Sequence, residues 1–260
     1  MEGKHLEIQI RDRVALITIH RPPMNTLSRE TLYELETILN EAETNDSIGC
    51  LIITGSGDKN FSAGADISEF GEMGDRKTAE KTLRRMNDLF NWIEGFPKPI
   101  IACINGKALG GGNELQMACH LAIAADTSEL GLPEVRLGIM PGYGGTQRLP
   151  RLIGRRRALD LMLSGERISA QTALEYGLVN RVVSQDKLRD EAFHWAKQLA
   201  DGPPIAIKGI LDAAIRGTDQ SLIQGLEIER EHMLTVARTE DAIEGITAFF
   251  AKSPPSFKGR

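Results

Sequence analysis

The sequence is poor in the residues that build disulfide and metal sites. Its three cysteines are an odd number and lie in apolar stretches, so we expect buried, reduced thiols of a cytoplasmic protein rather than disulfides or metal ligands. The five histidines never take the spacing of a zinc site, and the chain has neither a Walker loop nor a GxGxxG motif. These absences argue against metal, nucleotide-hydrolysis and dinucleotide chemistry, and no metal is expected.

Long apolar runs and excess positive charge are also missing. No apolar run approaches the ~20 residues that a membrane-spanning helix requires. The N-terminal stretch mixes charges with alternating apolar residues, which is typical of a strand and not of a signal sequence. A net charge of −5 argues against a polyanion as the main partner. We therefore expect a protein that binds neither membranes nor nucleic acid.

The remaining composition, with 41% hydrophobic residues, is typical of a large globular domain. Apolar runs such as VALITI (14–19), CLIITG (50–55), HLAIAAD and SELGLPEV read as strands, and they alternate with helical segments such as residues 78–94, where Leu83 is expected to face inward. This alternation predicts an α/β fold with largely buried strands. After about residue 195 the strand pattern disappears. We predict a core of residues 1–195 and a helical subdomain of residues 196–260 that packs on the core or on a neighbouring subunit.

Gly-rich stretches lie beside acids at separate points of the chain. KALGGGNELQMAC (107–119) has consecutive glycines before Glu114, FSAGADISEF (61–70) has small residues before an acid, and GLPEVRLGIMPGYGGTQRLP (131–150) contains Glu134 and a second Gly-rich turn. Glycine is costly at a helix start because it loses much backbone freedom on folding. Bare N–H groups in a first helical turn, however, lack intrahelical partners and attract negative charge. Junctions of this kind that face one point would form an oxyanion hole.

Together, FSAGADISE, NGKALGGGNEL and GLPEVRLGIMPGYGGTQRL resemble the enoyl-CoA hydratase/isomerase (crotonase) superfamily. RPPMNTL near the start and ISAQTALEYGLVNRVV at 168–183 extend the resemblance over nearly the whole chain. The resemblance implies a spiral of repeated ββα units with a C-terminal helical region that makes trimers, usually paired into hexamers. It also implies an acyl-CoA thioester substrate, so coenzyme A would be part of the substrate and no separate cofactor is expected.

The resemblance also implies roles for particular residues. By motif position, the backbone N–H groups of Ala65 and Gly111 would hold the thioester oxygen. The N–H of Gly142 would help to hold the reacting water. The hydratases of this family use two glutamates, which fall on Glu114 and Glu134.

Contacts with coenzyme A are implied for two segments. The backbone of Ala63, Asp66 and Ile67 would lie along the adenine and pantetheine. Asp66 is also expected to cap the helix that follows AGA. Lys258, in the terminal FKGR, would reach the nucleotide bound to a neighbouring subunit; the alternative is a frayed terminus.

A pair of glutamates suits the hydration of an α,β-unsaturated thioester for a chemical reason. Water must lose a proton as it adds to C3, C2 must gain one, and negative charge collects on the thioester oxygen. Two carboxyl groups in one dry cavity can hold different protonation states. We therefore interpret Glu114 as the general base that acts on water and Glu134 as the acid toward C2, and we predict an enoyl-CoA hydratase.

Other functions stay open at this point. An acyl-CoA double-bond isomerase on the same scaffold needs one base to move a proton between C2 and C4, and Glu134 alone would suffice. A basic cluster in QRLPRLIGRRRALD could contact phosphate, as in hydratase homologues that bind AU-rich RNA, but a solvated face or an inter-subunit ion-pair site is the simpler interpretation. This cluster consists of Arg148, Arg151, Arg155, Arg156 and Arg157. The acyl-chain preference cannot be read from the sequence.

Overall fold

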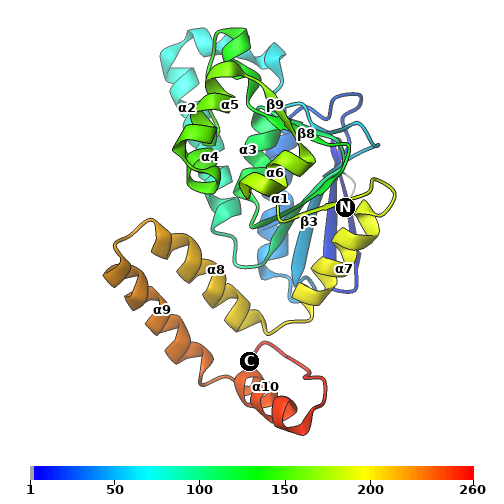
Figure 1. Cartoon of the computed structure of the whole chain (residues 1–260), viewed down its shortest axis with the longest axis vertical. Coiled ribbons are helices and arrows are strands. Elements are labelled where there is room, and N and C mark those ends of the chain that lie inside the picture. Colours follow the sequence, from blue (N-terminus) through cyan, green and yellow to red (C-terminus); the bar gives the residue numbers. More distant parts are fainter. Residues whose placement is uncertain (1–2) are drawn as a thin grey trace.

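The chain folds into two β-sheets with helices packed around them (Figure 1). The computed structural model describes residues 3–260, apart from the side chains of Phe70, Glu72 and Met73. The strands are β1 (Leu6–Arg11), β2 (Val14–Ile19), β3 (Cys50–Gly55), β4 (Asn60–Ser62), β5 (Ile100–Ile104), β6 (Lys107–Leu109), β7 (Leu121–Ala125), β8 (Glu129–Gly131), β9 (Arg167–Ser169) and β10 (Arg181–Val183). Within the described range, the larger sheet has the order β1-β2-β3-β5-β7-β10 and the smaller one the order β4-β6-β8-β9.

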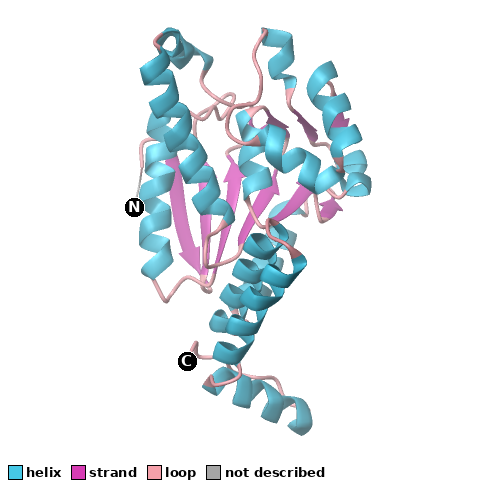
Figure 2. Cartoon of the chain, turned by 90° about the vertical axis from the view of Figure 1, so that its left-hand side faces the viewer, coloured by secondary structure: helices cyan, strands magenta, loops and turns pink. Residues whose placement is uncertain are grey.

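The helices connect these strands and then continue beyond them (Figure 2). The α-helices are α1 (Arg29–Thr44), α2 (Arg76–Glu94), α3 (Gly111–Ala118), α4 (Gly145–Ile153), α5 (Arg155–Ser164), α6 (Ala170–Tyr176), α7 (Leu188–Ala200), α8 (Pro204–Thr218), α9 (Leu222–Val236) and α10 (Glu240–Ala251). The 3₁₀ helices are η1 (Ile67–Gly74) and η2 (Pro133–Leu137).

A repeated unit organises the core. In the successions β3-β4-α2, β5-β6-α3 and β7-β8-α4, the first strand joins the larger sheet, the second joins the smaller sheet, and a helix follows. The strands within each of the sets β3-β5-β7 and β4-β6-β8 pair in parallel. The predicted α/β fold of repeated ββα units is therefore confirmed.

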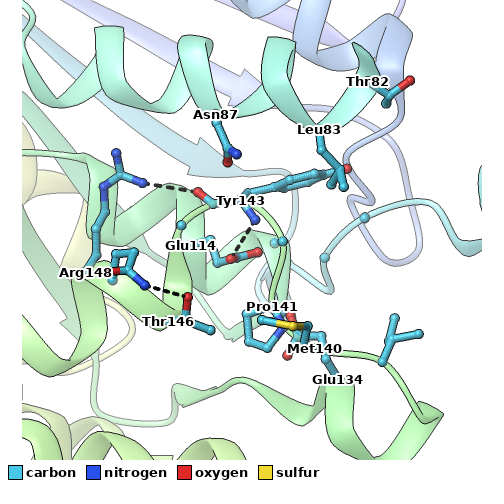
Figure 3. Close-up of a pocket in the computed structure, with 18 of the residues that line it drawn as sticks. Thr82, Leu83, Asn87, Glu114, Glu134, Met140, Pro141, Tyr143, Thr146 and Arg148 are labelled. Carbon is cyan, nitrogen blue, oxygen red and sulfur yellow. Dashed lines mark hydrogen bonds between the residues drawn. The ribbon is translucent and has the colours of Figure 1, made fainter. Parts of the chain in front are cut away.

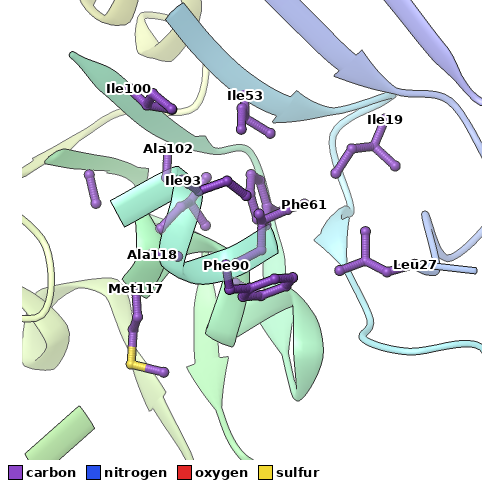
Figure 4. Close-up of a cluster of buried hydrophobic side chains, with 14 of the residues drawn as sticks. Ile19, Leu27, Ile53, Phe61, Phe90, Ile93, Ile100, Ala102, Met117 and Ala118 are labelled. Atoms are coloured by element: carbon purple, nitrogen blue, oxygen red, sulfur yellow. The ribbon is translucent and has the colours of Figure 1, made fainter. Parts of the chain in front are cut away.

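The central strands β3 and β5 of the larger sheet are buried on both faces, which explains why they read as continuous apolar runs. On β3, Cys50 and Ile52 belong to the apolar cluster that α7 covers, whereas Leu51 and Ile53 belong to the cluster on the opposite face. Side chains alternate between the faces because successive residues of a strand point in opposite directions. Figure 4 shows part of the second cluster, in which the sheet packs against α2 and α3.

Helix α7 lies across the boundary predicted at residue 195. Leu188, Trp195 and Ala200 are all buried in the cluster with the larger sheet, so the chain leaves the core after Ala200. From there α8, α9 and α10 extend away from the two sheets, as Figure 1 shows. We call residues 204–251 the C-terminal arm.

The strand expected through SELGLPEV is shorter than its apolar pattern suggested. β8 ends at Gly131, and Pro133 opens η2, which contains Glu134. Proline cannot donate a ladder hydrogen bond, and its fixed φ suits the first turn of a helix. Glu134 is thereby held on a helical turn.

Candidate active site

A cavity of about 900 Å³ lies where α2, η1, η2 and the first turns of α3 and α4 meet. Leu83 lines it and does not join the buried face of α2, contrary to the expectation from helical spacing. The cavity brings together the Gly-rich stretches that are far apart in the sequence. Its lining includes Ala63, Gly64, Ala65, Asp66, Ile67, Gly110, Gly111, Glu114, Glu134 and Gly142.

The glycine run that opens α3 meets a different steric requirement at each position. Gly110 has φ 52° and ψ −129°, a conformation that residues with a Cβ rarely adopt. A Cβ on Gly111 would lie 3.2 Å from the backbone nitrogen of Ala65, and one on Gly112 would lie 2.3 Å from the carbonyl oxygen of Ser62. The run therefore lets α3 start tightly against β4 and keeps the space beside the Ala65 N–H open.

The backbone N–H groups of Ala65 and Gly111 lie close together at this cavity. Leu27 bridges the chain around Ala65: its N–H donates to the carbonyl of Gly64 at 2.8 Å, and its carbonyl accepts from the N–H of Asp66 at 3.2 Å. In a parallel bridge of this kind, the hydrogen bonds involve Gly64 and Asp66, the neighbours of Ala65 in the chain. The N–H of Ala65 itself takes no part in them. Gly111 starts α3, so its N–H has no helical carbonyl one turn earlier. Among residues 3–260 neither N–H finds an acceptor, as an oxyanion hole requires.

Glu114 is buried, and the loop before α4 fixes its carboxyl group. Its Oε1 accepts a hydrogen bond from the N–H of Tyr143 at 2.8 Å (Figure 3). The same oxygen accepts from the N–H of Gly145 at 2.7 Å. Glu114 as a whole residue is only 2% exposed to solvent. Oε2 makes no hydrogen bond with the described residues, so this oxygen is available to a small molecule in the cavity.

Glu134 enters the cavity from η2 and has a different environment. Its Oε2 is shielded from solvent and has no hydrogen-bond partner within residues 3–260. Its Oε1 lies beside the glycine run, since a Cβ on Gly110 would be 3.0 Å from it. A buried carboxyl oxygen without a donor favours the protonated, neutral form.

Burial raises the pKa of both carboxyl groups. Desolvation raises the pKa of Glu114 from 4.5 to about 7, and the nearby charge of Glu134 adds to the rise, while the N–H groups of Gly145 and Tyr143 oppose it. Desolvation also raises the pKa of Glu134. Donors stabilise the carboxylate of Glu114, whereas the described chain offers none to Oε2 of Glu134. Near neutral pH the pair can therefore hold one proton between two carboxyl groups that are held differently.

Arg148 braces the loop that holds Glu114. Its guanidinium donates to the carbonyl of Tyr143 at 3.1 Å, to the carboxylate of Glu94 at 2.8 and 3.0 Å, and to the amide oxygen of Asn91 at 2.8 Å. Its side chain is 8% exposed. The sequence placed Arg148 in a basic surface cluster, and the structure corrects that assignment. In the sequence, only the position of Arg148 one helical turn after Gly144 indicates a role at this loop. No local pattern indicates that Asn91 and Glu94 take part.

The rest of the predicted basic cluster serves separate contacts. Arg151 pairs with Asp219 of the C-terminal arm at 3.4 Å, and Arg157 lies over a tyrosine ring, 4.3 Å from its centroid. Arg155 and Arg156 are exposed. The arginines that are close in sequence therefore do not all share one surface.

The residues predicted to contact coenzyme A divide between two places. Ala63, Asp66 and Ile67 line the cavity, and Asp66 caps η1 as predicted, with Oδ1 accepting from the N–H of Ser68 at 3.0 Å. Lys258 lies beyond the C-terminal arm and is absent from the lining of its own chain's cavity. Its backbone N–H donates to Asp241 at 2.6 Å, so the terminus is anchored and not frayed.

Metal-binding clusters and membrane-spanning helices are both missing from the part of the chain that the structure describes. That part of the chain has no group of His, Cys, Asp and Glu side chains that could hold a metal ion. It also has no helix with the length and apolarity needed to cross a membrane. The three cysteines are free thiols.

Comparison with known proteins places the whole chain among close relatives. The sequence model of the family described as enoyl-CoA hydratase/isomerase matches residues 9–260. The chain is 40% identical to the 2,3-dehydroadipyl-CoA hydratase of Escherichia coli, over 98% of this chain and 99% of that protein. It is 38% identical to the short-chain-enoyl-CoA hydratase of Clostridium acetobutylicum, over 100% of both chains.

A solved structure shows the same likeness in three dimensions. The crystal structure of an enoyl-CoA hydratase from Bacillus anthracis matches with a TM-score of 0.94 and 40% identity, covering 99% of this chain and 100% of that one. The match extends over the core and the C-terminal arm, so the predicted spiral fold with its helical C-terminal region is confirmed.

Proposed function

This chain belongs to the enoyl-CoA hydratase/isomerase family, and from that premise we propose that it is an enoyl-CoA hydratase. The reaction is the reversible addition of water across the 2,3 double bond of a 2-enoyl-CoA thioester. The observation that carries the proposal is the convergence of two differently held carboxyl groups and a pair of unbonded N–H groups on one cavity.

The N–H groups of Ala65 and Gly111 would receive the thioester oxygen. Negative charge develops on this oxygen as water adds to C3, and fixed donors in a dry site stabilise that charge without having to reorganise. Each donor would lower the barrier by about 3 kcal/mol. The carbonyl would then lie at the N-terminus of α3, where the helix dipole adds to the stabilisation.

Glu114 would act as the general base. Tyr143 and Gly145 occupy its Oε1, so Oε2 would take a proton from water while the water oxygen bonds to C3. The backbone N–H of Gly142, which lines the cavity next to this loop, would help to orient the water. Proton transfer to a positioned base contributes roughly 10²–10⁴-fold to the rate.

Glu134 would act as the acid. Its unpartnered, buried Oε2 favours a proton that can be given to C2 as the enolate collapses to the saturated thioester. After one turnover Glu114 carries the proton and Glu134 the charge, so exchange with solvent must restore the starting state. Dehydration uses the same groups in reverse.

The cavity would bind coenzyme A along η1. Ala63, Asp66 and Ile67 lie on that side of the oxyanion hole and would contact the adenine and pantetheine. Because Lys258 is remote from its own cavity, it would reach only the nucleotide bound to another subunit.

The C-terminal arm would join copies of the chain into a trimer or a pair of trimers. Large apolar side chains on its helices are exposed to solvent, among them Leu222, Ile223, Phe249 and Phe250 at 74–78%. Exposed apolar side chains of this size on one arm favour an association site, since burying them removes them from water. We also propose a cytoplasmic location, because the free thiols are consistent with a reducing compartment.

The test of the proposed activity is direct. Purified protein is mixed with crotonyl-CoA, and the loss of the enoyl-thioester absorbance is followed. Rapid loss, reduced at least ~10²-fold by either Glu114→Gln or Glu134→Gln, is expected. Wild-type protein that hydrates neither crotonyl-CoA nor longer 2-enoyl-CoA thioesters would contradict the proposal.

The same variants separate hydratase from isomerase. A 3-enoyl-CoA substrate is offered to the wild type and to Glu114→Gln. Isomerisation through Glu134 alone would survive the loss of Glu114, whereas hydration requires both carboxyl groups. Persistent isomerisation without hydration would identify an isomerase.

A further inference from the structure

Helix α2 presents two distinct faces to the interior. Met86, Leu89, Phe90 and Ile93 are buried in the apolar core. A neighbouring face lines the cavity instead, and most of its side chains are polar. This face includes Thr78, Thr82, Leu83, Asn87, Asn91 and Glu94.

Asn87 is one of two polar side chains of this face, with Thr82, that make no hydrogen bond with the described residues. Figure 3 shows its side chain directed into the cavity, toward Tyr143 and Glu114. Its amide makes no hydrogen bond with the described residues, whereas the amide of Asn91, one turn later, accepts from Arg148 at 2.8 Å. Asn87 therefore offers the cavity one acceptor and two donors.

The ring of Tyr143 lies between this part of the cavity and the core. Its centroid is 5.4 Å from that of Phe90, which follows Asn87 by one helical turn. On the other side, Thr146 and Gln147 in the first turn of α4 line the cavity and are hydrogen-bonded to each other at 3.2 Å. An acyl chain that passes Glu114 on this side thus meets amide and hydroxyl groups.

We propose that Asn87 is a specificity-determining residue, which selects 2-enoyl-CoA thioesters whose acyl chain carries a neutral hydrogen-bonding group, such as a hydroxyl, beyond C3. The proposal rests on the proposed hydratase function. A hydroxyl donates and accepts at once, and so does the amide of Asn87. An alkyl tail would leave that amide without a partner in a cavity from which the tail has displaced water.

The charges around the cavity argue for a neutral group and against a carboxylate. Glu94, Glu114 and Glu134 all line it. The guanidinium of Arg148 is already bonded to Glu94, and that of Arg151 pairs with Asp219. Arg29, which also lines the cavity, pairs with Glu69 at 3.3 Å. A terminal carboxylate would therefore be desolvated beside other carboxyl groups, while each arginine of the described lining is already paired with an acid.

The test compares matched pairs of substrates. The ratio of kcat/KM for 4-hydroxy-2-butenoyl-CoA to that for 2-pentenoyl-CoA is measured, and likewise for 6-hydroxy-2-hexenoyl-CoA and 2-heptenoyl-CoA. In the wild type we expect a ratio above one for at least one pair. In Asn87→Leu that ratio should fall on the order of tenfold, while kcat/KM for crotonyl-CoA stays within about threefold. Asn87→Ala, which adds no bulk, should show the same change.

Control measurements make each outcome decisive. Asp88→Leu changes the next residue, which is exposed on α2, and should leave every ratio as in the wild type. Ratios below one in the wild type, ratios unaffected by the change at Asn87, or an equal loss on all substrates would overturn the proposal. A preference for 2,3-dehydroadipyl-CoA over the hydroxylated thioesters would also overturn it. Failure of the hydratase function is distinguishable, because the wild type would then not hydrate crotonyl-CoA either.

Discussion

At the scale of single residues, Glu114 reconciles two opposed conditions. Its carboxyl group is buried, which disfavours charge, yet the N–H groups of Tyr143 and Gly145 are placed to stabilise that charge. The pKa of about 7 in the folded state exceeds the value of 4.5 expected in the unfolded chain. Protonated Glu114 therefore favours folding below pH 4.5, and this contribution is lost as the pH rises through 7.

Glu114→Gln should consequently change the pH dependence of stability. Glutamine keeps an oxygen that can accept from Tyr143 and Gly145 but never becomes charged. Relative to the wild type, the variant should gain about 2.5 kcal/mol in free energy of unfolding between pH 5 and pH 8. Thermal midpoints at both pH values, at one protein concentration, would measure this difference. Glu41→Gln, an exposed position on α1, is the control and should show no comparable gain.

Gly111 tests the oxyanion hole without touching a carboxyl group. A Cβ at this position would come within 3.2 Å of the Ala65 nitrogen and of the Tyr143 ring, where the thioester oxygen would bind. Gly111→Val should lower kcat/KM for crotonyl-CoA by roughly 10²–10³-fold, with a smaller loss for Gly111→Ala. Circular dichroism would establish that the variant is folded. A folded Gly111→Val protein with wild-type activity would exclude Gly111 from the site.

Substitution of Arg148 tests how the loop around Tyr143 supports Glu114, the proposed base. Its positive charge lowers the pKa of Glu114, and its bond to the Tyr143 carbonyl fixes the N–H on the same loop. Arg148→Met should lower kcat about tenfold or more and shift the acidic limb of the kcat/KM profile to higher pH. Arg148→Lys should restore part of the pH profile but not all of kcat. Arg156→Met, at an exposed position, should change neither.

At the scale of elements, the packing of α3 on β4 determines where Gly111 and Glu114 lie in the cavity. Gly112 cannot accept a side chain there, because a Cβ would lie 2.3 Å from the Ser62 carbonyl oxygen and 2.7 Å from the Ser62 Cβ. Gly112→Ala should therefore destabilise the fold by about 1–3 kcal/mol, through displacement of α3. Urea unfolding monitored by tryptophan fluorescence would measure it. An unchanged midpoint would show that α3 tolerates more space than its contacts imply.

Some parts of the candidate site can be recognised from the sequence alone, and others cannot. Gly111, Glu114 and Ala65 lie in short stretches where small residues adjoin acids, and that pattern is local. The bond from Arg148 to Glu94 joins residues 54 positions apart, so no spacing rule marks it. Asn87 sits on a helix whose periodicity locates its buried face, but the adjoining cavity exists only once α4 and η2 are in place. Sequence reasoning thus named the carboxyl and N–H groups that meet at the cavity and missed the side chains that hold or surround them.

At the scale of the whole molecule, the C-terminal arm leaves a large apolar surface unburied. Phe249 and Phe250 are 77% and 78% exposed and stack edge to face against each other. Burying each ring against another copy of the chain would contribute about 1.5–3 kcal/mol. If the arm joins copies as proposed, changing both to Asp should convert the wild-type oligomer into smaller species, as light scattering coupled to gel filtration would show. Glu41→Lys, on the core, should keep the assembly intact, and a wild-type monomer would refute this role of the arm.

The position of α7 has a consequence for how the chain matures during synthesis. One face of the larger sheet is covered by a helix that begins only at Leu188, although β2 and β3 are made near the start of translation. Until that helix emerges from the ribosome, Val14, Cys50 and Ile101 have no cover on that side. A nascent chain that ends before Leu188 would therefore leave the apolar residues of these strands exposed to solvent. Chaperones bind apolar surfaces of this kind. Among the helices that the structure describes, α7 is thus the one whose late synthesis determines when this face of the larger sheet can be buried.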